Sequence, residues 1–230
     1  MAGSYVTVTG QDGAFAAYVA RADTESAPAI VVIQEIFGVN AVMRGVADEL
    51  AAQGYHAICP DLFWRLEPGV DITDQSKAEW DKALGLMGRF DVDKGVEDIA
   101  ATLAFIRADE GCNGKVGAVG YCLGGRLAFL TAARTDADAS VSYYGVGLEQ
   151  MLDETIRCPL LLHIAGEDGF SSPEARTAVV EALRHNPMAT LAIYPHRDHA
   201  FARPGGEHYH AEDAGRANAL TMDHLARALR

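Results

Sequence analysis

Short apolar runs alternate with amphipathic stretches along almost the whole chain. Residues 29–34 form an apolar run with β-branched side chains, which is typical of a strand buried on both faces of a parallel sheet. Residues 41–53 instead have apolar side chains at helical spacing and stop at Gly54, so they predict a helix. Residues 5–9 and 14–20 predict an antiparallel pair around a short turn. The other predicted strands are 56–59, 116–120, 139–144, 160–165 and 190–194, and the other predicted helices are 77–88, 93–107, 123–134, 174–185 and 211–228.

This alternation of strands and helices predicts an α/β fold, with a mostly parallel sheet and helices on both of its faces. The chain has 230 residues and shows no internal repeat, low-complexity tract or linker that would divide it. We therefore expect one domain over residues 1–230, large enough to bury a substantial core. Sites in such sheets form beyond the carboxyl ends of the strands, so we look for chemistry in the segments that follow strands.

The charge balance limits the choice of partner. A formal net charge of −13 and an isoelectric point near 4.9 argue against nucleic acid and anionic lipid, because both bind clustered Lys and Arg. The N-terminus lacks a basic stretch followed by an apolar run, and no segment approaches the roughly 20 apolar residues of a membrane helix. The four cysteines are scattered without C-x-x-C spacing, as expected of free thiols in the cytoplasm.

The most informative segment is Gly120-Tyr121-Cys122-Leu123-Gly124, which follows a predicted strand and opens a predicted helix. Gly-x-Cys-x-Gly in this setting has the pattern of a nucleophile elbow with Cys in place of Ser. Side chains at Gly120 and Gly124 would collide with neighbouring backbone in so sharp a turn. The helix N-terminus would lower the pKa of the Cys122 thiol. We predict that Cys122 is a nucleophile; the alternative is a buried structural cysteine.

A nucleophile of this kind needs a histidine base and an acid that orients the base, in the chain order nucleophile, acid, histidine. Glu167 and Asp168 follow one predicted strand, and His196 and His199 follow the next. We prefer Asp168 as the acid, and His199 as the base because its loop needs length to carry the ring back over the elbow. Glu167 and His196 are then solvated surface residues.

A metal site is the alternative for the histidine-rich segment, which contains His196, His199, His208 and His210. No Cys or carboxylate accompanies these histidines at a familiar ligand spacing, and the triad already uses His199. We therefore expect no metal in this protein.

With these residues identified, the chain resembles the dienelactone hydrolase family, the carboxymethylenebutenolidases, over nearly its whole length. The resemblance rests on the segments 34–40, 59–63, 120–125, 143–147 and 199–203. It implies an α/β-hydrolase fold, hydrolysis of dienelactone to maleylacetate during the breakdown of chlorinated catechols, and no cofactor. It also implies a catalytic triad formed by Cys122, His199 and Asp168.

The resemblance assigns roles to further residues. It implies that the Glu35 carboxylate takes up the thiol proton when substrate arrives, and that the backbone N–H groups of Ile36 and Leu123 hold the oxyanion. It implies that Arg203 binds the substrate carboxylate and pairs with Glu35, and that Tyr144 contacts the substrate. By position alone, Glu35 is better interpreted as a loop acid at a strand end, and Arg203 has the alternative of a surface arginine.

One position departs from the family pattern. The second arginine that binds the substrate carboxylate is replaced by Trp80, which cannot supply a charged, bidentate fork. Lys77, one helical turn earlier, is a cation that would reach the same space, although as a weaker point charge. Alternatively, the helix is rotated and Trp80 packs in the core. Ala200 also stands where the family has a serine. An aromatic side chain at position 80 favours a bulkier or less charged ester.

We predict a hydrolase of a small-molecule ester or lactone that acts through a thioester intermediate, as a monomer without nucleic-acid or membrane partners. A broader carboxylesterase or thioesterase on the same triad is the alternative within this class. From a different class, the chain would be a non-catalytic α/β-hydrolase module that keeps a ligand in its pocket. That hypothesis expects a missing triad member, and the sequence contains all three.

Overall fold

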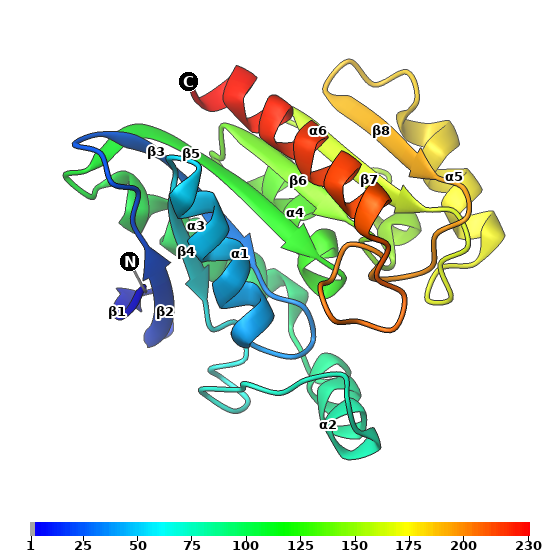
Figure 1. Ribbon diagram of the computed structural model, residues 1–230, viewed down its shortest axis with the longest axis horizontal. Helices are drawn as coiled ribbons and strands as arrows, with labels where there is room; N and C mark the ends of the chain where they lie inside the picture. Colours follow the sequence, from blue (N-terminus) through cyan, green and yellow to red (C-terminus); the bar gives the residue numbers. More distant parts are fainter. Residues whose placement is uncertain (1–2) are drawn as a thin grey trace. The chain divides into compact units, whose positions relative to one another are not determined.

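The computed structural model describes residues 3–230, and the chain divides into two compact units, Met1–Ala118 and Val119–Arg230 (Figure 1). Strand β5 (Cys112–Tyr121) begins in the first unit and ends in the second. Both units combine strands with helices, so the predicted α/β class is confirmed. The single domain over residues 1–230 stays a prediction.

The strands of the first unit form an antiparallel hairpin next to a parallel pair. β1 pairs with β2 in antiparallel register, β2 pairs with β4 in the same sense, and β4 pairs with β3 in parallel. The order within this unit is therefore β1-β2-β4-β3. The bounds of these strands are β1 (Ser4–Thr9), β2 (Ala14–Ala20), β3 (Ala27–Ile33) and β4 (His56–Pro60).

Two helices of the first unit, α1 (Ala41–Ala52) and α3 (Val92–Arg107), both pack on β3 and β4. Every residue of these two strands is buried, so the helices cover opposite faces of the parallel pair. A third helix, α2 (Lys77–Met87), follows a loop. Each of the three helices has an N-cap residue whose side chain accepts a hydrogen bond from the backbone N–H three residues later. This bond satisfies a donor that has no partner within the helix. The N-cap residues are Asn40, Ser76 and Asp91.

The second unit contains the parallel strands β6 (Ala139–Tyr143), β7 (Leu160–Ala165) and β8 (Ala189–Tyr194), which pair in that order. Helices α4 (Leu123–Arg134) and α6 (Ala211–Leu229) both pack on β6, and all residues of β6 are buried. These two helices therefore cover opposite faces of the strand. In Figure 1, α6 passes across β6 and β7.

The third helix of the second unit, α5 (Pro173–Leu183), packs on β8 and on a short 3₁₀ helix, η1 (Leu148–Met151). All the strands and helices predicted from the sequence are present, most of them to within one or two residues. β5 begins at Cys112 rather than at residue 116. The first residues of the strand were not predicted because residues 113–115 are polar or glycine and give no apolar pattern. The sequence also gives no sign of η1, since four residues are too few to show a helical period.

None of the helices in residues 3–230 has the combination of length and hydropathy that crossing a membrane requires.

Candidate active site

The candidate nucleophile lies at a strained turn between a strand and a helix. β5 ends at Tyr121, α4 begins at Leu123, and Cys122 between them has φ 56° and ψ −116°. A positive φ is unfavourable for a residue with a side chain, so the surrounding structure must hold it. A Cβ at Gly120 would lie 1.9 Å from the carbonyl oxygen of Gly124, which only glycine avoids. The steric reason predicted for the Gly120 position is therefore confirmed.

Backbone hydrogen bonds fix the position of this turn within the second unit. The N–H of Cys122 donates to the carbonyl oxygen of Tyr143 at 3.1 Å, and the N–H of Arg126 donates to the carbonyl oxygen of Cys122 at 3.1 Å. A Cβ at Gly125 would lie 2.5 Å from the carbonyl oxygen of Tyr143, so glycine allows α4 to approach the end of β6 closely. The Cys122 side chain is buried at the N-terminus of α4, where the helix dipole favours a negative charge.

The candidate acid and base come together from two loops. Asp168 follows β7 and His199 follows β8, and Nδ1 of His199 lies 3.0 and 3.1 Å from the two carboxylate oxygens of Asp168. Both side chains are almost fully buried, at 4% and 5% exposure. Nδ1–H therefore donates to Asp168, and this leaves Nε2 of His199 for the nucleophile.

The electrostatics of His199 reflect this arrangement. Burial lowers the pKa of His199, but the charge of Cys122, the hydrogen bond that His199 donates to Asp168 and the hydrogen bond with Cys122 outweigh burial and raise the pKa to about 10. The imidazole of His199 is therefore protonated at neutral pH. Within the second unit, hydrogen bonds thus link Cys122 to His199 and His199 to Asp168.

Aromatic rings contact the imidazole of His199. The Tyr144 ring meets it edge-on with centroids 5.2 Å apart, and the Phe170 ring lies at 4.7 Å. Tyr144 and Ala200 both have positive φ, at 38° and 61°, so the backbone is held in an unfavourable conformation on both sides of the imidazole. The Tyr144 N–H donates to the carbonyl oxygen of His163 at 2.8 Å and ties it to β7. Tyr144, predicted to contact substrate, therefore lies against the candidate base.

A second buried histidine, His163, belongs to a separate hydrogen-bond network. Its Nδ1 lies 3.0 Å from the Tyr194 hydroxyl and its Nε2 lies 2.9 Å from the Thr221 hydroxyl. The Tyr143 hydroxyl contacts Thr221 at 2.7 Å and donates to Asn218 at 3.0 Å. Burial lowers the pKa of His163 to about 3, so it is neutral at physiological pH. This network joins three strands to α6 and has a structural role.

Glu167 and His196, the alternatives to Asp168 and His199 as acid and base, lie on the surface. The side chains of Glu167 and His196 are 65% and 82% exposed and form a hydrogen bond with each other at 3.3 Å. His208 Nδ1 lies 3.2 Å from the carbonyl oxygen of His199, and His210 accepts the Asp213 N–H at the start of α6. The histidines therefore have separate partners. Across residues 3–230, no group of three or more His, Cys, Asp or Glu side chains is arranged to hold a metal ion.

In the first unit, the loop after β3 carries the other predicted residues, Glu35 and Ile36, both of which are buried. The Gln34 side chain fixes this loop: its Nε2 donates to the Glu35 carbonyl oxygen at 3.3 Å, and its Oε1 accepts the Leu62 N–H at 3.0 Å. Gly38 has φ 78°, and a Cβ there would lie 1.9 Å from a carbonyl oxygen. The loop therefore has little freedom to move.

Trp80 lies beside this loop, within the first unit. Its ring meets Phe37 edge-on with centroids 5.1 Å apart, and its Nε1–H donates to the Asp74 carbonyl oxygen at 2.9 Å. Lys77 has 87% of its side chain exposed and forms an ion pair with Asp81 at 2.6 Å. The suggestion that Lys77 replaces the missing arginine stays a prediction.

Arg203 is buried in the second unit, so its interpretation as a surface arginine is wrong. The Arg203 N–H donates to the Ala200 carbonyl oxygen at 3.0 Å, which closes a turn directly after His199. A Cβ at Gly206 would lie 2.9 Å from Nε of Arg203, so glycine leaves room for the guanidinium. Leu123, whose N–H is predicted to hold an oxyanion, is the first residue of α4.

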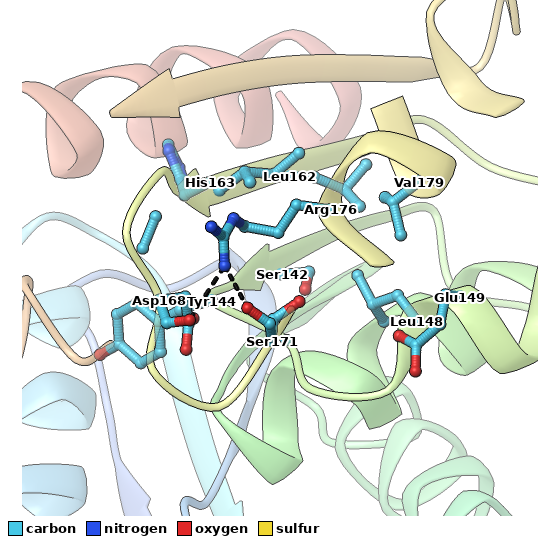
Figure 2. A pocket seen from close by; sticks show the side chains of 13 residues that line it. Ser142, Tyr144, Leu148, Glu149, Leu162, His163, Asp168, Ser171, Arg176 and Val179 are labelled. Atoms are coloured by element: carbon cyan, nitrogen blue, oxygen red, sulfur yellow. Dashed lines mark hydrogen bonds between the residues drawn. The ribbon is translucent and has the colours of Figure 1, made fainter. Parts of the chain in front are cut away.

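Two residues near the candidate triad, Asp198 and Arg176, were not predicted from the sequence. A cavity of about 30 Å³ lies in the second unit, and Asp168, Tyr144, Leu162 and Arg176 are among its lining residues (Figure 2). Nη1 of Arg176 donates to the carbonyl oxygens of Asp168, at 2.9 Å, and of Ser171. The only sequence signal for Asp198 is its place next to His199, and Arg176 gives no signal in an amphipathic helix.

Comparison with known proteins agrees with this description. The dienelactone hydrolase family model matches residues 15–229. A candidate carboxymethylenebutenolidase of Azospirillum brasilense is 49% identical over 225 residues, which cover 92% of this chain and 93% of the relative. The carboxymethylenebutenolidase of Pseudomonas putida is 41% identical over 224 residues, covering 96% and 95%. The crystal structure of a candidate dienelactone hydrolase from Klebsiella pneumoniae aligns with this chain with a TM-score of 0.84 and 25% identity. The alignment covers 97% of this chain and 98% of the Klebsiella chain.

The structural match shows that the chain has the predicted α/β-hydrolase fold. The family match and the curated relatives then show that the chain belongs to the dienelactone hydrolase family, as the sequence motifs indicated. Family membership also confirms the predicted enzyme class, a carboxylic ester hydrolase.

Proposed function

We propose that this protein hydrolyses an ester or lactone through a thioester formed on Cys122. The observation that carries the proposal is the hydrogen-bonded set of Cys122, His199 and Asp168, in which Cys122 lies at a strained strand-to-helix turn. A buried cysteine with a purely structural role needs neither a positive φ nor a histidine held by a carboxylate. All three residues belong to the second unit.

The proposed reaction has two steps. The Cys122 thiolate attacks the carbonyl carbon, and the backbone N–H groups of Leu123 and Ile36 stabilise the oxyanion that forms. The tetrahedral intermediate collapses, the C–O bond breaks, and the alkoxide or enolate leaves with its electron pair and takes the proton from Nε2 of His199, which becomes neutral. His199 then takes a proton from water, which attacks the thioester and releases the acid and the Cys122 thiolate. Asp168 keeps Nδ1 of His199 protonated throughout.

For the substrate, we propose a lactone that carries a carboxylate, as the carboxymethylenebutenolidase names of the relatives suggest. Arg203, which is buried and follows the candidate base closely in the chain, is the cation proposed to bind that carboxylate. Glu35 is the proposed acceptor of the thiol proton when substrate arrives. Trp80 in place of a second arginine favours a second candidate, a carboxylesterase that accepts uncharged aromatic esters.

The test is Cys122→Ala, assayed on cis- and trans-dienelactone beside a panel of aryl esters. We expect hydrolysis of every substrate to fall about a thousandfold or more, because no other group in the triad replaces the nucleophile. Cys158→Ala is the matched control, since Cys158 is equally buried, at 7% against 6%, and burial raises the pKa of its thiol to about 11.

Normal turnover by Cys122→Ala would contradict the nucleophile assignment. Preference for neutral aryl esters over dienelactone would replace the lactonase with the carboxylesterase. Iodoacetamide titration addresses the non-catalytic binding module: that hypothesis requires Cys122 to react no faster than an ordinary thiol at every pH.

A further inference from the structure

The loops that carry Asp168 and His199 lie side by side and are joined step by step. The parallel pairing of β7 with β8 continues beyond the strand ends, because the Gly166 N–H donates to the Tyr194 carbonyl oxygen at 2.8 Å. The Glu167 N–H then donates to the Arg197 carbonyl oxygen at 2.9 Å. These two bonds bring the loops to the position just before the acid and the base.

The next connection is made by a side chain, Asp198. Its Oδ1 accepts the Gly169 N–H at 2.8 Å and the His199 N–H at 2.6 Å. One oxygen atom therefore binds two backbone groups: that of Gly169, which follows the candidate acid, and that of His199, the candidate base. The other oxygen faces His208, whose Nδ1 lies 3.5 Å away.

The charge state of Asp198 suits this bridge. Burial raises its pKa, but the hydrogen bonds from Gly169 and His199 outweigh burial, so the pKa lies below its ordinary value. The side chain is therefore an ionised acceptor at neutral pH, and bonds from N–H groups to a carboxylate are stronger than neutral ones. Asp198 binds backbone groups only on the triad side, so it has no direct part in proton transfer.

We propose that Asp198 is a positioning residue, which joins the acid loop to the base loop and sets the alignment of Asp168 with His199. The proposal rests on the proposed function, because it gives the alignment a catalytic purpose. The distance between the Asp168 carboxylate and Nδ1 depends on how far apart the two loops are held. A displacement of about 1 Å in a catalytic group can reduce a rate by about a hundredfold.

The experiment compares Asp198→Asn, Asp198→Glu and Asp198→Ala with wild type. Asn keeps an oxygen at the bridging position but loses the charge, whereas Glu keeps the charge but moves the oxygen by one methylene. We expect kcat to fall about 10- to 100-fold in Asp198→Ala and in Asp198→Glu, and less than about fivefold in Asp198→Asn. KM should stay within about twofold in all three variants, because Asp198 does not contact substrate.

Asp223→Ala is the matched control, since Asp223 is a surface acid with 67% exposure that pairs with Arg227 in α6. It should leave kcat and the melting temperature unchanged. If Asp198→Ala does not fold, the order of kcat in the Asn and Glu variants decides the question on its own. A Glu variant with wild-type kcat, or an Asn variant as slow as the Glu variant, would overturn the positioning role.

Cys122→Ala, assayed in parallel, separates this proposal from the proposed function. An inactive Cys122→Ala beside a fully active Asp198→Ala would overturn the positioning role alone. Normal turnover by Cys122→Ala would overturn the proposed function and the positioning role with it.

Discussion

At the scale of single residues, His199 couples the chemistry of the site to the stability of the fold. Its pKa in the folded protein, about 10, lies above the ordinary value of 6.5 even though burial alone lowers it. A group whose pKa is raised on folding stabilises the folded state fully below its unfolded pKa. That contribution is lost as the pH rises from about 6.5 through 10.

We expect Cys122→Ala to lower the pKa of His199, because the negative charge of Cys122 is the largest of the causes that raise it. NMR titration of the imidazole C–H signals measures the change directly. The free energy of unfolding should also decline less between pH 6.5 and 10 in Cys122→Ala than in wild type. Cys158→Ala should behave as wild type in both measurements. An unchanged His199 pKa in Cys122→Ala would show that Asp168 alone sets it.

At the scale of elements, the sequence was sufficient to predict the strands, the helices and the three residues of the candidate triad. Apolar periodicity located β7 and β8, and the rule that sites follow strand ends then singled out Asp168 and His199. Arg176 and Asp198 were missed because both bind backbone atoms of a loop. Such contacts depend on how loops fold back on each other, and this leaves no periodic signal in a sequence.

Arg176 connects helix α5 to the acid loop, and we expect Arg176→Met to weaken that connection. The variant loses hydrogen bonds from a guanidinium to the carbonyl oxygens of Asp168 and Ser171. Bonds to charged groups contribute about 1.5–3 kcal/mol, so the melting temperature should fall by roughly 3–12 °C for a chain of this size. We expect kcat to fall a few-fold as the Asp168 loop loosens. Calorimetry and steady-state kinetics measure the two effects.

Arg184→Met is the control for this experiment, because Arg184 follows the same helix and forms an exposed pair with Glu181. Exposed pairs contribute about 0–1 kcal/mol, so its melting temperature should scarcely change. Equal melting temperatures for Arg176→Met and Arg184→Met would mean that the acid loop is held by other contacts.

At the scale of the whole molecule, the residues predicted for one active site come from both units of the chain. Cys122, Asp168, His199 and Arg203 belong to the second unit, and their burial and contacts agree with the roles proposed for them. Glu35, Ile36 and Trp80 belong to the first unit. Strand periodicity and family resemblance located both sets, but the sequence alone does not define which substrate the complete enzyme accepts.

Trp80 is the residue through which the first unit is expected to influence that choice. Its indole packs edge-on against Phe37, in the same loop as Glu35 and Ile36, while Lys77 pairs with Asp81. A charge-assisted hydrogen bond contributes about 1.5–3 kcal/mol, which is about ten- to a hundredfold in specificity. We therefore expect Trp80→Arg to raise kcat/KM for anionic dienelactone, relative to a neutral aryl ester, by up to that factor.

Trp80→Phe is the control that separates the gain of a charge from the loss of the indole. It removes the hydrogen bond to the Asp74 carbonyl oxygen while keeping an aromatic ring against Phe37, so it should leave the ratio of the two kcat/KM values close to wild type. A ratio that rises in both variants would assign the effect to the lost indole. A ratio that stays at the wild-type value in Trp80→Arg would show that position 80 does not contact the substrate carboxylate. The triad would be unaffected by that result, because all three of its residues lie in the second unit.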